Sequence, residues 1–300
     1  MSLEEYRKSK SLDKLLGAIK EDDKPQVEKK SYVDERMWKP ELDKSGNGYA
    51  VIRFLPATDM TKSWVKLYSH AFQGPTGQWY IENSLTTLPG QKDPVSEHNT
   101  ALWNSGVESD KELARKQKRK LSYYSNIYVV SDPKHPENEG KVFLFRYGKK
   151  IWDKISEAAT PAFEDEKPLN AFDLDEGANF KLKIRKVDGY WNYDKSEFDA
   201  PSALFDNDEK MEEVFNSQHD LQEFLAPTNF KSYDELKTRL DVVLSGTVTA
   251  KTAESIMDDP IEPVVDTKPI MSADDFNNKA QKAEEEDDDT MSYFEKLASN

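Results

Sequence analysis

Apolar and polar side chains alternate in several short stretches between residues 49 and 187, and this alternation predicts β-strands. The stretches are residues 49–56, 64–72, 78–82, 127–130, 141–147 and 179–187, and turn-forming residues separate them. The segment Gly74–Gly77 lies between two of them and predicts a hairpin turn. Five or more short strands joined by turns indicate a small β-barrel or a Greek-key sheet with added helices.

Helical periodicity is limited to a few other segments. We expect helices at residues 149–158 and at about residues 207–225 and 232–245. Residues 83–108 contain turn formers and few apolar side chains, so an irregular loop is expected there, and residues 189–193 predict an aromatic turn. The pattern therefore predicts an α+β protein whose core spans residues 25–253.

The two ends of the chain differ from this core in composition. Residues 1–24 combine cations with Leu12, Leu15, Leu16 and Ile19 at helical spacing, which predicts a short basic arm that packs on a partner surface. Residues 254–300 contain fourteen Asp or Glu against four Lys, a net charge of −10 out of −15 for the whole chain. We therefore expect a disordered acidic tail that recruits basic partners or competes for a basic groove.

The composition argues against several classes of protein. No apolar run is long enough to span a bilayer, and the first residues do not resemble a signal peptide. The absence of cysteine excludes disulfides and thiolate metal sites. The chain has no phosphate-binding glycine loop and no nucleophile motif, and its densest carboxylate cluster lies in the predicted tail, so we do not expect an enzyme.

Three segments combine cations with aromatic side chains, namely residues 118–128, 143–152 and 181–193. Cations neutralise phosphates and rings stack on unpaired bases, so the combination predicts a groove for single-stranded nucleic acid. The competing interpretation is a solvated basic helix and a strand with half-buried tyrosines, and Phe143 and Trp152 are the first candidates for the core. The side chains expected to bind are Lys118, Arg119, Lys120, Tyr123, Tyr124, Phe145, Arg146, Tyr147, Lys149, Lys150, Lys183, Arg185, Tyr190 and Tyr193.

Several blocks of this sequence resemble the helix-destabilising, single-stranded DNA-binding proteins of T-even bacteriophages. The blocks are SGNGYAVIRFLP (45–56), KRKLSYYSNIYVV (118–130), ENEGKVFLFRYGKKIWDKI (137–155), EGANFKLKIRKV (176–187) and GYWNYDKSEF (189–198). They occur in the family's order, and the similarity extends from about residue 36 to residue 245.

The resemblance implies an OB-fold β-barrel core with a β-rich loop subdomain, which binds single-stranded DNA without sequence preference in phage DNA replication, recombination and repair. It implies that the basic arm mediates cooperative contacts between protomers along DNA through Arg7, Lys8, Ser9, Lys10 and Ser11. It also implies that the acidic tail contacts replication and recombination proteins, and that the protein acts in the cytoplasm of the bacterial host.

This sequence departs from the family at the positions of the family's zinc ligands. The family holds a structural zinc through one histidine and three cysteines, and His70 falls at the histidine, whereas Asn83, Asp93 and Ser96 fall near the cysteine positions. A site built from a carboxylate with His70 or His98 would be weak without thiolates. We therefore expect that the metal has been lost and that the protein has no cofactor.

The alternative function is an acidic protein-interaction scaffold that carries a basic patch. Salt dependence separates the two functions, because the affinity of a groove that neutralises several phosphates falls as the salt concentration rises. A scaffold would show little response to salt on oligo-dT.

Overall fold

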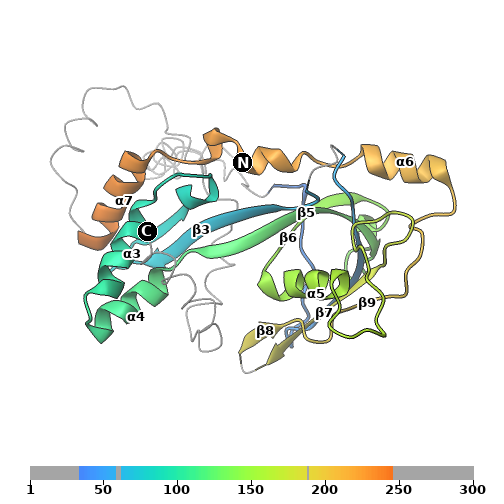
Figure 1. Cartoon of the computed structure of the whole chain (residues 1–300), viewed down its shortest axis with the longest axis horizontal. Helices are drawn as coiled ribbons and strands as arrows, with labels where there is room; N and C mark the ends of the chain where they lie inside the picture. The colour runs from blue at the N-terminus through green and yellow to red at the C-terminus, as the bar shows by residue number, and fades with distance from the viewer. Residues whose placement is uncertain (1–33, 59–61, 188, 246–300) are drawn as a thin grey trace, which may run out of the picture. The chain divides into compact units, whose positions relative to one another are not determined.

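The computed structural model describes residues 34–58, 62–187 and 189–245, and these form a mixed α+β structure (Figure 1). The predicted basic arm (residues 1–24) and acidic tail (residues 254–300) lie outside these residues and stay predictions. Within the described part, every helix is too short or too polar to span a bilayer.

The described strands belong to one sheet. The central path runs β1–β6–β5–β2–β7–β8, β3 pairs with β4 and β5, and β9 pairs with β7. Strand β1 runs parallel to β6, and the other pairs are antiparallel. The strands are β1 (Met37–Trp38), β2 (Gly48–Phe54), β3 (Val65–Gln73), β4 (Trp79–Asn83), β5 (Lys120–Ser131), β6 (Val142–Tyr147), β7 (Phe180–Val187), β8 (Tyr190–Asn192) and β9 (Glu197–Phe198).

Helices gather at two places on this sheet. Figure 1 shows α3, α4 and α7 around one end of β3, whereas α5 lies close to β6 and β7. The α-helices are α3 (Pro94–Asn104), α4 (Glu108–Gln117), α5 (Lys149–Ala159), α6 (Asp208–Asn216) and α7 (Tyr233–Ser245). Short 3-10 helices are η1 (Leu85–Thr87), η2 (Pro136–Asn138), η3 (Leu221–Leu225) and η4 (Pro227–Asn229).

The main core lies on one face of β2, β5 and β7 and is closed by α5. Side chains alternate along these strands, so Ile52 and Phe54 of β2 and Leu182 of β7 point inward, and Ile151 and Ile155 of α5 pack against them. Phe54 is fully buried, and four aromatic rings have centroids 5.6–6.5 Å from its own. Burial of apolar and aromatic side chains is therefore the dominant stabilising contribution here.

A second core lies in a helical lobe, which we define as residues 70–117 together with α7. The rings of Phe72 and Tyr80 stack with centroids 5.2 Å apart, and Leu236 and Leu240 of α7 pack against them. The β3–β4 hairpin and α7 approach each other closely at Gly74, where a Cβ atom would lie 2.0 Å from the carbonyl oxygen of Val243. Glycine at this position therefore allows α7 to reach the β3–β4 hairpin.

Most of the predicted elements are confirmed, but the loop predicted at residues 83–108 is wrong. This segment contains η1, α3 and the start of α4, so the subdomain is helical rather than β-rich. Helix α3 begins at Pro94 after Asp93, whose Oδ1 accepts hydrogen bonds from the backbone N–H groups of Val95 and Ser96. Its buried face includes the polar Ser96 and Asn99, and it therefore lacks the apolar stripe that marks a helix in sequence.

Two further boundaries differ from the prediction. The predicted aromatic turn at residues 189–193 includes a strand, β8, which pairs with β7. Gly189 precedes it with a φ of 88°, a conformation that glycine adopts without strain. The helix predicted at residues 207–225 is divided into α6 and η3.

Candidate nucleic-acid interface

The outer face of β3 carries two aromatic rings with a cation between them. Trp64, just before the strand, Lys66 and Tyr68 occur at every second position, so they lie on one side of the backbone. Lys66 is exposed and the two rings are half-buried, whereas Val65 and Leu67 on the other side are buried against η3. The alternation therefore presents a row of ring, cation and ring to solvent.

Aromatic residues of β5 and α5 support this row. Lys66 is paired with Tyr123 across β3 and β5, and its Nζ lies 5.5 Å from the Tyr123 ring centroid and 5.8 Å from that of Trp152. The Tyr123 and Trp152 rings are stacked 4.6 Å apart and nearly parallel, and Trp64 lies 4.7 Å from Trp152. The cation is thus held over a stack of rings, an arrangement that is favourable for an ammonium group.

Arg119 extends the row at its other end. Its guanidinium lies over the Tyr68 ring, 3.9 Å from the centroid, and donates a hydrogen bond to the Thr86 hydroxyl. We call the set of Trp64, Lys66, Tyr68, Arg119, Tyr123 and Trp152 the β3 strip. It brings together side chains from β3 and the residue before it, from β5 and the segment that leads into it, and from α5.

Cations at the start of α5 lie close to the β3 strip in the structure. Lys149 and Lys150 are exposed. Lys149 is three residues before Trp152, so Lys149 and Trp152 lie on one side of the helix. Lys149 forms an exposed ion pair with Asp153 at 2.9 Å. Burial raises the pKa of the Tyr193 phenol, and the positive charge of Arg146 opposes this rise.

The predicted cationic face of β7 is present, but carboxylates accompany it. Lys183 lies 2.7 Å from Glu197, and Arg185 donates two hydrogen bonds to Asp194. A similar pair joins Lys181 to Asp199. Such exposed pairs contribute about 0–1 kcal/mol each, so a phosphate can replace the carboxylate at little cost.

The predicted binding residues do not all meet on one surface. Tyr123 and Tyr124 are neighbours in β5 and therefore point to opposite faces of the sheet, where Tyr123 meets Trp152 and Tyr124 stacks on Phe224 at 4.3 Å. Tyr123, Tyr124, Phe145 and Tyr147 are 2–5% exposed. The structure therefore places these four residues in cores, and Tyr123 serves the β3 strip as a buried support beneath Lys66 rather than as a ring on which a base can stack.

Other predicted residues keep accessible positions. Tyr190 is 42% exposed. The half-buried residues are Lys118, Lys120, Arg146, Lys183 and Tyr193, and Arg185 is exposed. The expected core residues Phe143 and Trp152 are partly buried against the main core, so Trp152 belongs both to the core and to the β3 strip.

Sequence reasoning missed the three β3 residues of the strip. The segment 64–68 was recognised as a strand, but its aromatic and cationic positions were not recognised as a binding face. The signal is the order Trp, Lys, Tyr at every second position, which places all three on one side of a strand. Tyr49 of β2 was also missed; it is 43% exposed and paired with Lys183.

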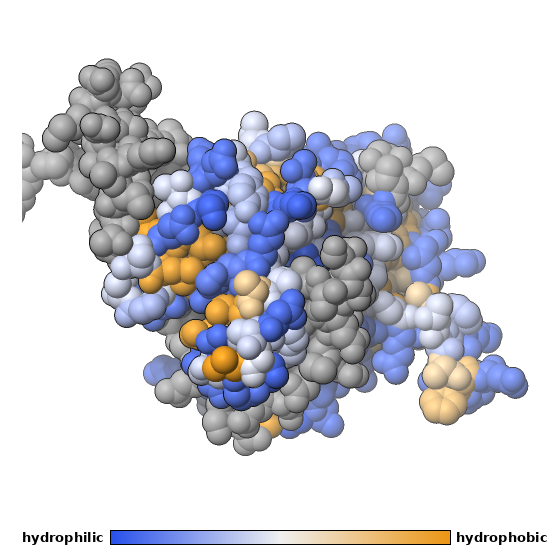
Figure 2. Space-filling model, turned by 60° about the vertical axis from the view of Figure 1, so that its left-hand side comes forward, coloured by the Kyte–Doolittle hydropathy of each residue, from blue (hydrophilic) through white to orange (hydrophobic). Residues whose placement is uncertain are grey.

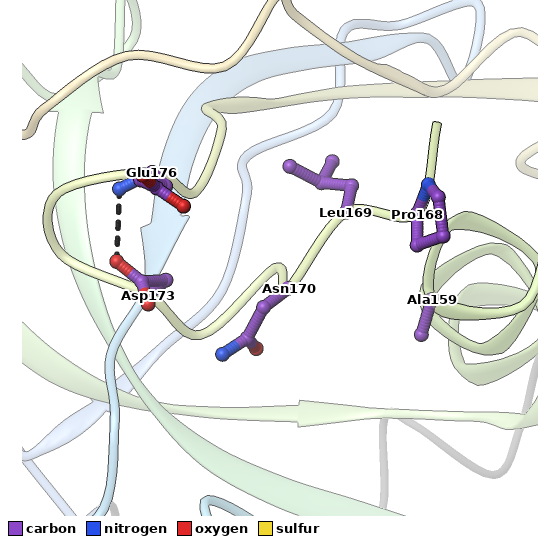
Figure 3. A pocket seen from close by; sticks show the side chains of 6 residues that line it. All are labelled: Ala159, Pro168, Leu169, Asn170, Asp173 and Glu176. Atoms are coloured by element: carbon purple, nitrogen blue, oxygen red, sulfur yellow. Dashed lines mark hydrogen bonds between the residues drawn. The ribbon is translucent and has the colours of Figure 1, made fainter. Parts of the chain in front are cut away.

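A pocket elsewhere in the structure has an unsuitable charge for nucleic acid. Figure 3 shows it between the end of α5 and the loop before β7, with Asn170, Asp173 and Glu176 among its lining residues. The Glu176 N–H donates to Asp173 Oδ1 at 2.8 Å, so this carboxylate closes a turn of the loop. The two acidic side chains would repel phosphate, so this pocket does not suit nucleic acid.

Comparisons with known proteins match most of this chain. The family model for gp32 DNA binding protein like proteins matches residues 46–244, which include β2 through most of α7. The single-stranded DNA-binding protein of Enterobacteria phage T2 is 40% identical over 257 residues, covering 84% of this chain and 83% of that protein. Its counterpart from Enterobacteria phage T4 is also 40% identical over 257 residues, covering 84% of each chain. The chain therefore belongs to the family of gp32 DNA binding protein like proteins.

Proposed function

We propose that this protein binds single-stranded DNA without sequence preference during phage DNA replication, and that the β3 strip is the centre of its binding surface. The observation that carries the proposal is the row of Trp64, Lys66 and Tyr68 along β3, in which Lys66 lies over the stacked Tyr123 and Trp152 rings. The names of the T2 and T4 relatives support the choice of single-stranded DNA as ligand.

The chemistry of the strip suits an unpaired strand better than a duplex. A ring can stack only on a base whose face is free, and each such contact contributes about 1–3 kcal/mol whatever the base. Lys66 and Arg119 lie beside the rings, where they can neutralise successive phosphates. Stacking with charge neutralisation provides affinity without reading base edges, and the role is therefore binding rather than catalysis.

Local charge explains how an acidic protein can bind a polyanion. A large part of the −15 net charge belongs to residues 254–300, whereas cations of β7 and α5 accompany the aromatic side chains. Lys149, Lys183 and Arg185 already form exposed ion pairs with carboxylates. DNA phosphates would replace these carboxylates, so the protein carries its cations in a neutralised form until DNA arrives.

The core of the DNA-binding domain is proposed to be an OB-fold. The support is the succession of β2, β5, β6, α5 and β7, in which β2 pairs with both β5 and β7, β5 pairs with β6, and the helix follows β6. In this arrangement α5 closes one end of the main core and places Trp152 at its rim. OB-folds commonly bind oligonucleotides on the faces and loops of such a barrel.

The terminal segments complete the proposal. Residues 1–24 would make cooperative contacts between protomers, and residues 254–300 would recruit replication, recombination and repair proteins in the infected host cell. Binding to short and long oligo-dT by chains that lack residues 1–24 tests the first role. Loss of clustering on long strands only is expected, and equal loss on both lengths would place the arm in the DNA-binding surface instead.

The central test measures oligo-dT affinity by fluorescence anisotropy over a range of salt concentrations. The logarithm of the affinity should fall with the logarithm of salt by about 0.7 per phosphate neutralised, and Lys66→Ala should reduce that slope by about one phosphate. Trp64→Ala should weaken binding by about 1–3 kcal/mol at every salt concentration. Lys210→Ala, an exposed cation on α6, is the matched control. A flat salt response of the intact chain would favour the scaffold function.

A further inference from the structure

The four positions that correspond to the zinc ligands of related proteins lie in the helical lobe. His70 is in β3, Asn83 ends β4, Asp93 caps α3, and Ser96 is in its first turn. Among the described residues there is no group of three or more His, Asp or Glu side chains that could hold a metal ion.

His70 has both ring nitrogens against protein oxygens. Its side chain is 1% exposed, Nδ1 lies 3.0 Å from the carbonyl oxygen of Gln117, and Nε2 lies 3.2 Å from Asp93 Oδ1. Only the Nδ1 contact has hydrogen-bond geometry, whereas Nε2 is buried without a hydrogen-bond partner and lies in a close contact with the carboxylate. One imidazole nitrogen beside one carboxylate supplies fewer donors than the four that a structural zinc takes.

Asp93 uses both carboxylate oxygens in hydrogen bonds. Oδ1 accepts from the N–H groups of Val95 and Ser96, and Oδ2 accepts from the Ser84 hydroxyl and the Leu85 N–H, all at 3.0–3.1 Å. Burial by itself would raise the pKa of Asp93, but the contact with His70 and these hydrogen bonds lower it to about 2. The carboxylate is therefore a buried anion whose acceptor positions are already filled.

The other two positions also fit zinc poorly. The Asn83 amide donates to the carbonyl oxygen of Asn229 at 3.0 Å, and the Ser96 backbone N–H donates to Asp93. Neither side chain is a ligand that zinc prefers over water. The residues at these positions bind one another and the backbone, and they do not form a tetrahedral donor set.

The contacts of the His70–Asp93 pair join β3 to the start of α3, as a zinc ion would, and they add η1 and the end of α4. Gln117 directly precedes the segment that carries Arg119, whose guanidinium lies over Tyr68 in the β3 strip. The pair therefore holds the last residue of α4 two positions away from a proposed DNA contact.

We propose that the buried His70–Asp93 pair organises the helical lobe without zinc, and that it acts as a positioning pair for Arg119 of the β3 strip. The organisation of the lobe without zinc is supported by the hydrogen bonds within the lobe. The positioning of Arg119 rests on the proposed function of the strip, because it assumes that Arg119 contacts DNA.

The metal part is tested on the intact wild-type chain. Protein purified without chelator should hold no stoichiometric zinc by elemental analysis, and a strong zinc chelator should leave both its Tm and its oligo-dT affinity unchanged. One zinc per chain, or a fall in Tm on chelation, would overturn the proposal. These measurements need no variant and do not depend on whether DNA binds.

A double-mutant cycle tests the pair itself. Asp93→Asn keeps the size and a helix-capping oxygen, and His70→Gln keeps one hydrogen-bonding group, but each removes the buried pairing. Each single change should lower Tm by roughly 10 °C, and the double change should cost clearly less than the sum of both. Additive effects would show that the two residues act separately, and the proposal would fail.

His135→Gln is the matched control for this cycle. His135 contacts Glu41 and Glu137 at the surface, so its replacement removes a histidine–carboxylate contact without disturbing a buried one. We expect the control to keep Tm and oligo-dT affinity, whereas folded Asp93→Asn protein should bind oligo-dT several-fold more weakly. Unchanged DNA affinity in folded Asp93→Asn protein would overturn the positioning role, and loss of all DNA binding by wild type would refute the proposed function alone.

Discussion

The main core and the helical lobe are stabilised by different kinds of interaction. The main core surrounds Phe54 with aromatic and aliphatic side chains from several strands and α5. The lobe has a smaller apolar core and adds buried polar contacts, such as that between His70 and Asp93. A buried charge depends on its partner, so the lobe should be more sensitive than the main core to the loss of a single polar group.

The surfaces of the two regions also differ in what they offer to DNA. The main core supports the aromatic part of the β3 strip through Tyr123 and Trp152, whereas the lobe positions Arg119. Figure 2 turns the side that carries α3, α4 and α7 toward the viewer, and hydrophilic residues dominate it, with smaller apolar areas between them. The proposed interface therefore needs both regions, one for stacking and one for charge.

The largest expected effect comes from the centre of the main core. Phe54→Ala should lower the free energy of unfolding by about 3–5 kcal/mol, because a fully buried ring is replaced by a cavity. Denaturant unfolding followed by tryptophan fluorescence measures this change. Val51→Ala, on the other face of the same strand and only partly buried, serves as the control and should cost much less. Equal effects would contradict the assignment of the main core.

Gly74→Ala tests the contact between the β3–β4 hairpin and α7. The added Cβ would lie 2.0 Å from the Val243 carbonyl oxygen, and the backbone must move to relieve the clash, at a cost of about 1–3 kcal/mol. Hydrogen exchange should accelerate in α7 while the main-core strands stay protected. Gly148→Ala is the control, because a Cβ there meets no atom within 4 Å. Unaltered exchange in α7 would refute the close approach.

Glu82→Gln tests the charged contact that attaches α7 to β4 within the helical lobe. The Glu82 carboxylate is 5% exposed and lies 3.0 Å from Lys231 and 2.9 Å from Arg239. Both cations retain contact with solvent, so we expect a loss of about 1–2 kcal/mol rather than the full cost of a buried pair. The loss should shrink at high salt. A salt-independent effect would indicate lost packing instead of lost charge.

The smallest expected effect is a pH dependence at the surface of the main-core region. Hydrogen bonds to Glu137 and Glu41 raise the pKa of His135 above its usual value. The contact therefore stabilises the folded chain at pH values below the usual histidine pKa of about 6.5, and this contribution disappears as pH rises through the elevated pKa. An NMR titration of His135 checks the direction. A lowered pKa would contradict the contacts.

Arg53 shows how far the alternation pattern can mislead. It stands in a predicted strand between inward-facing Ile52 and Phe54, and alternation alone would place a charged side chain in solvent. The structure buries it completely, and its NH2 group donates to the backbone carbonyl oxygens of Asp173 and Ser202 at 2.9 and 2.8 Å. Loops from distant parts of the chain cover it, and no local pattern contains that information.

The sequence by itself determined most of the longer strands, most of the α-helices, the outline of the charge distribution and the family resemblance. These properties depend on near neighbours along the chain, since alternation, helical spacing and turn residues act over a few positions. It also determined that Tyr123 and Tyr124 must point in opposite directions once both lie in a strand, although the predicted site included both.

Only the tertiary structure decided which rings are accessible and which residues His70 and Asp93 contact. Tyr124 and Trp152 look equally suitable in sequence, but Tyr124 is covered by Phe224, whereas Trp152 lies at the rim of the main core beneath Lys66. The contact between His70 and Asp93 joins residues that β3–β4 pairing and the start of α3 bring together. The burial of a ring and the contacts of a polar side chain depend on segments far apart in the chain, and only the fold brings those segments into contact.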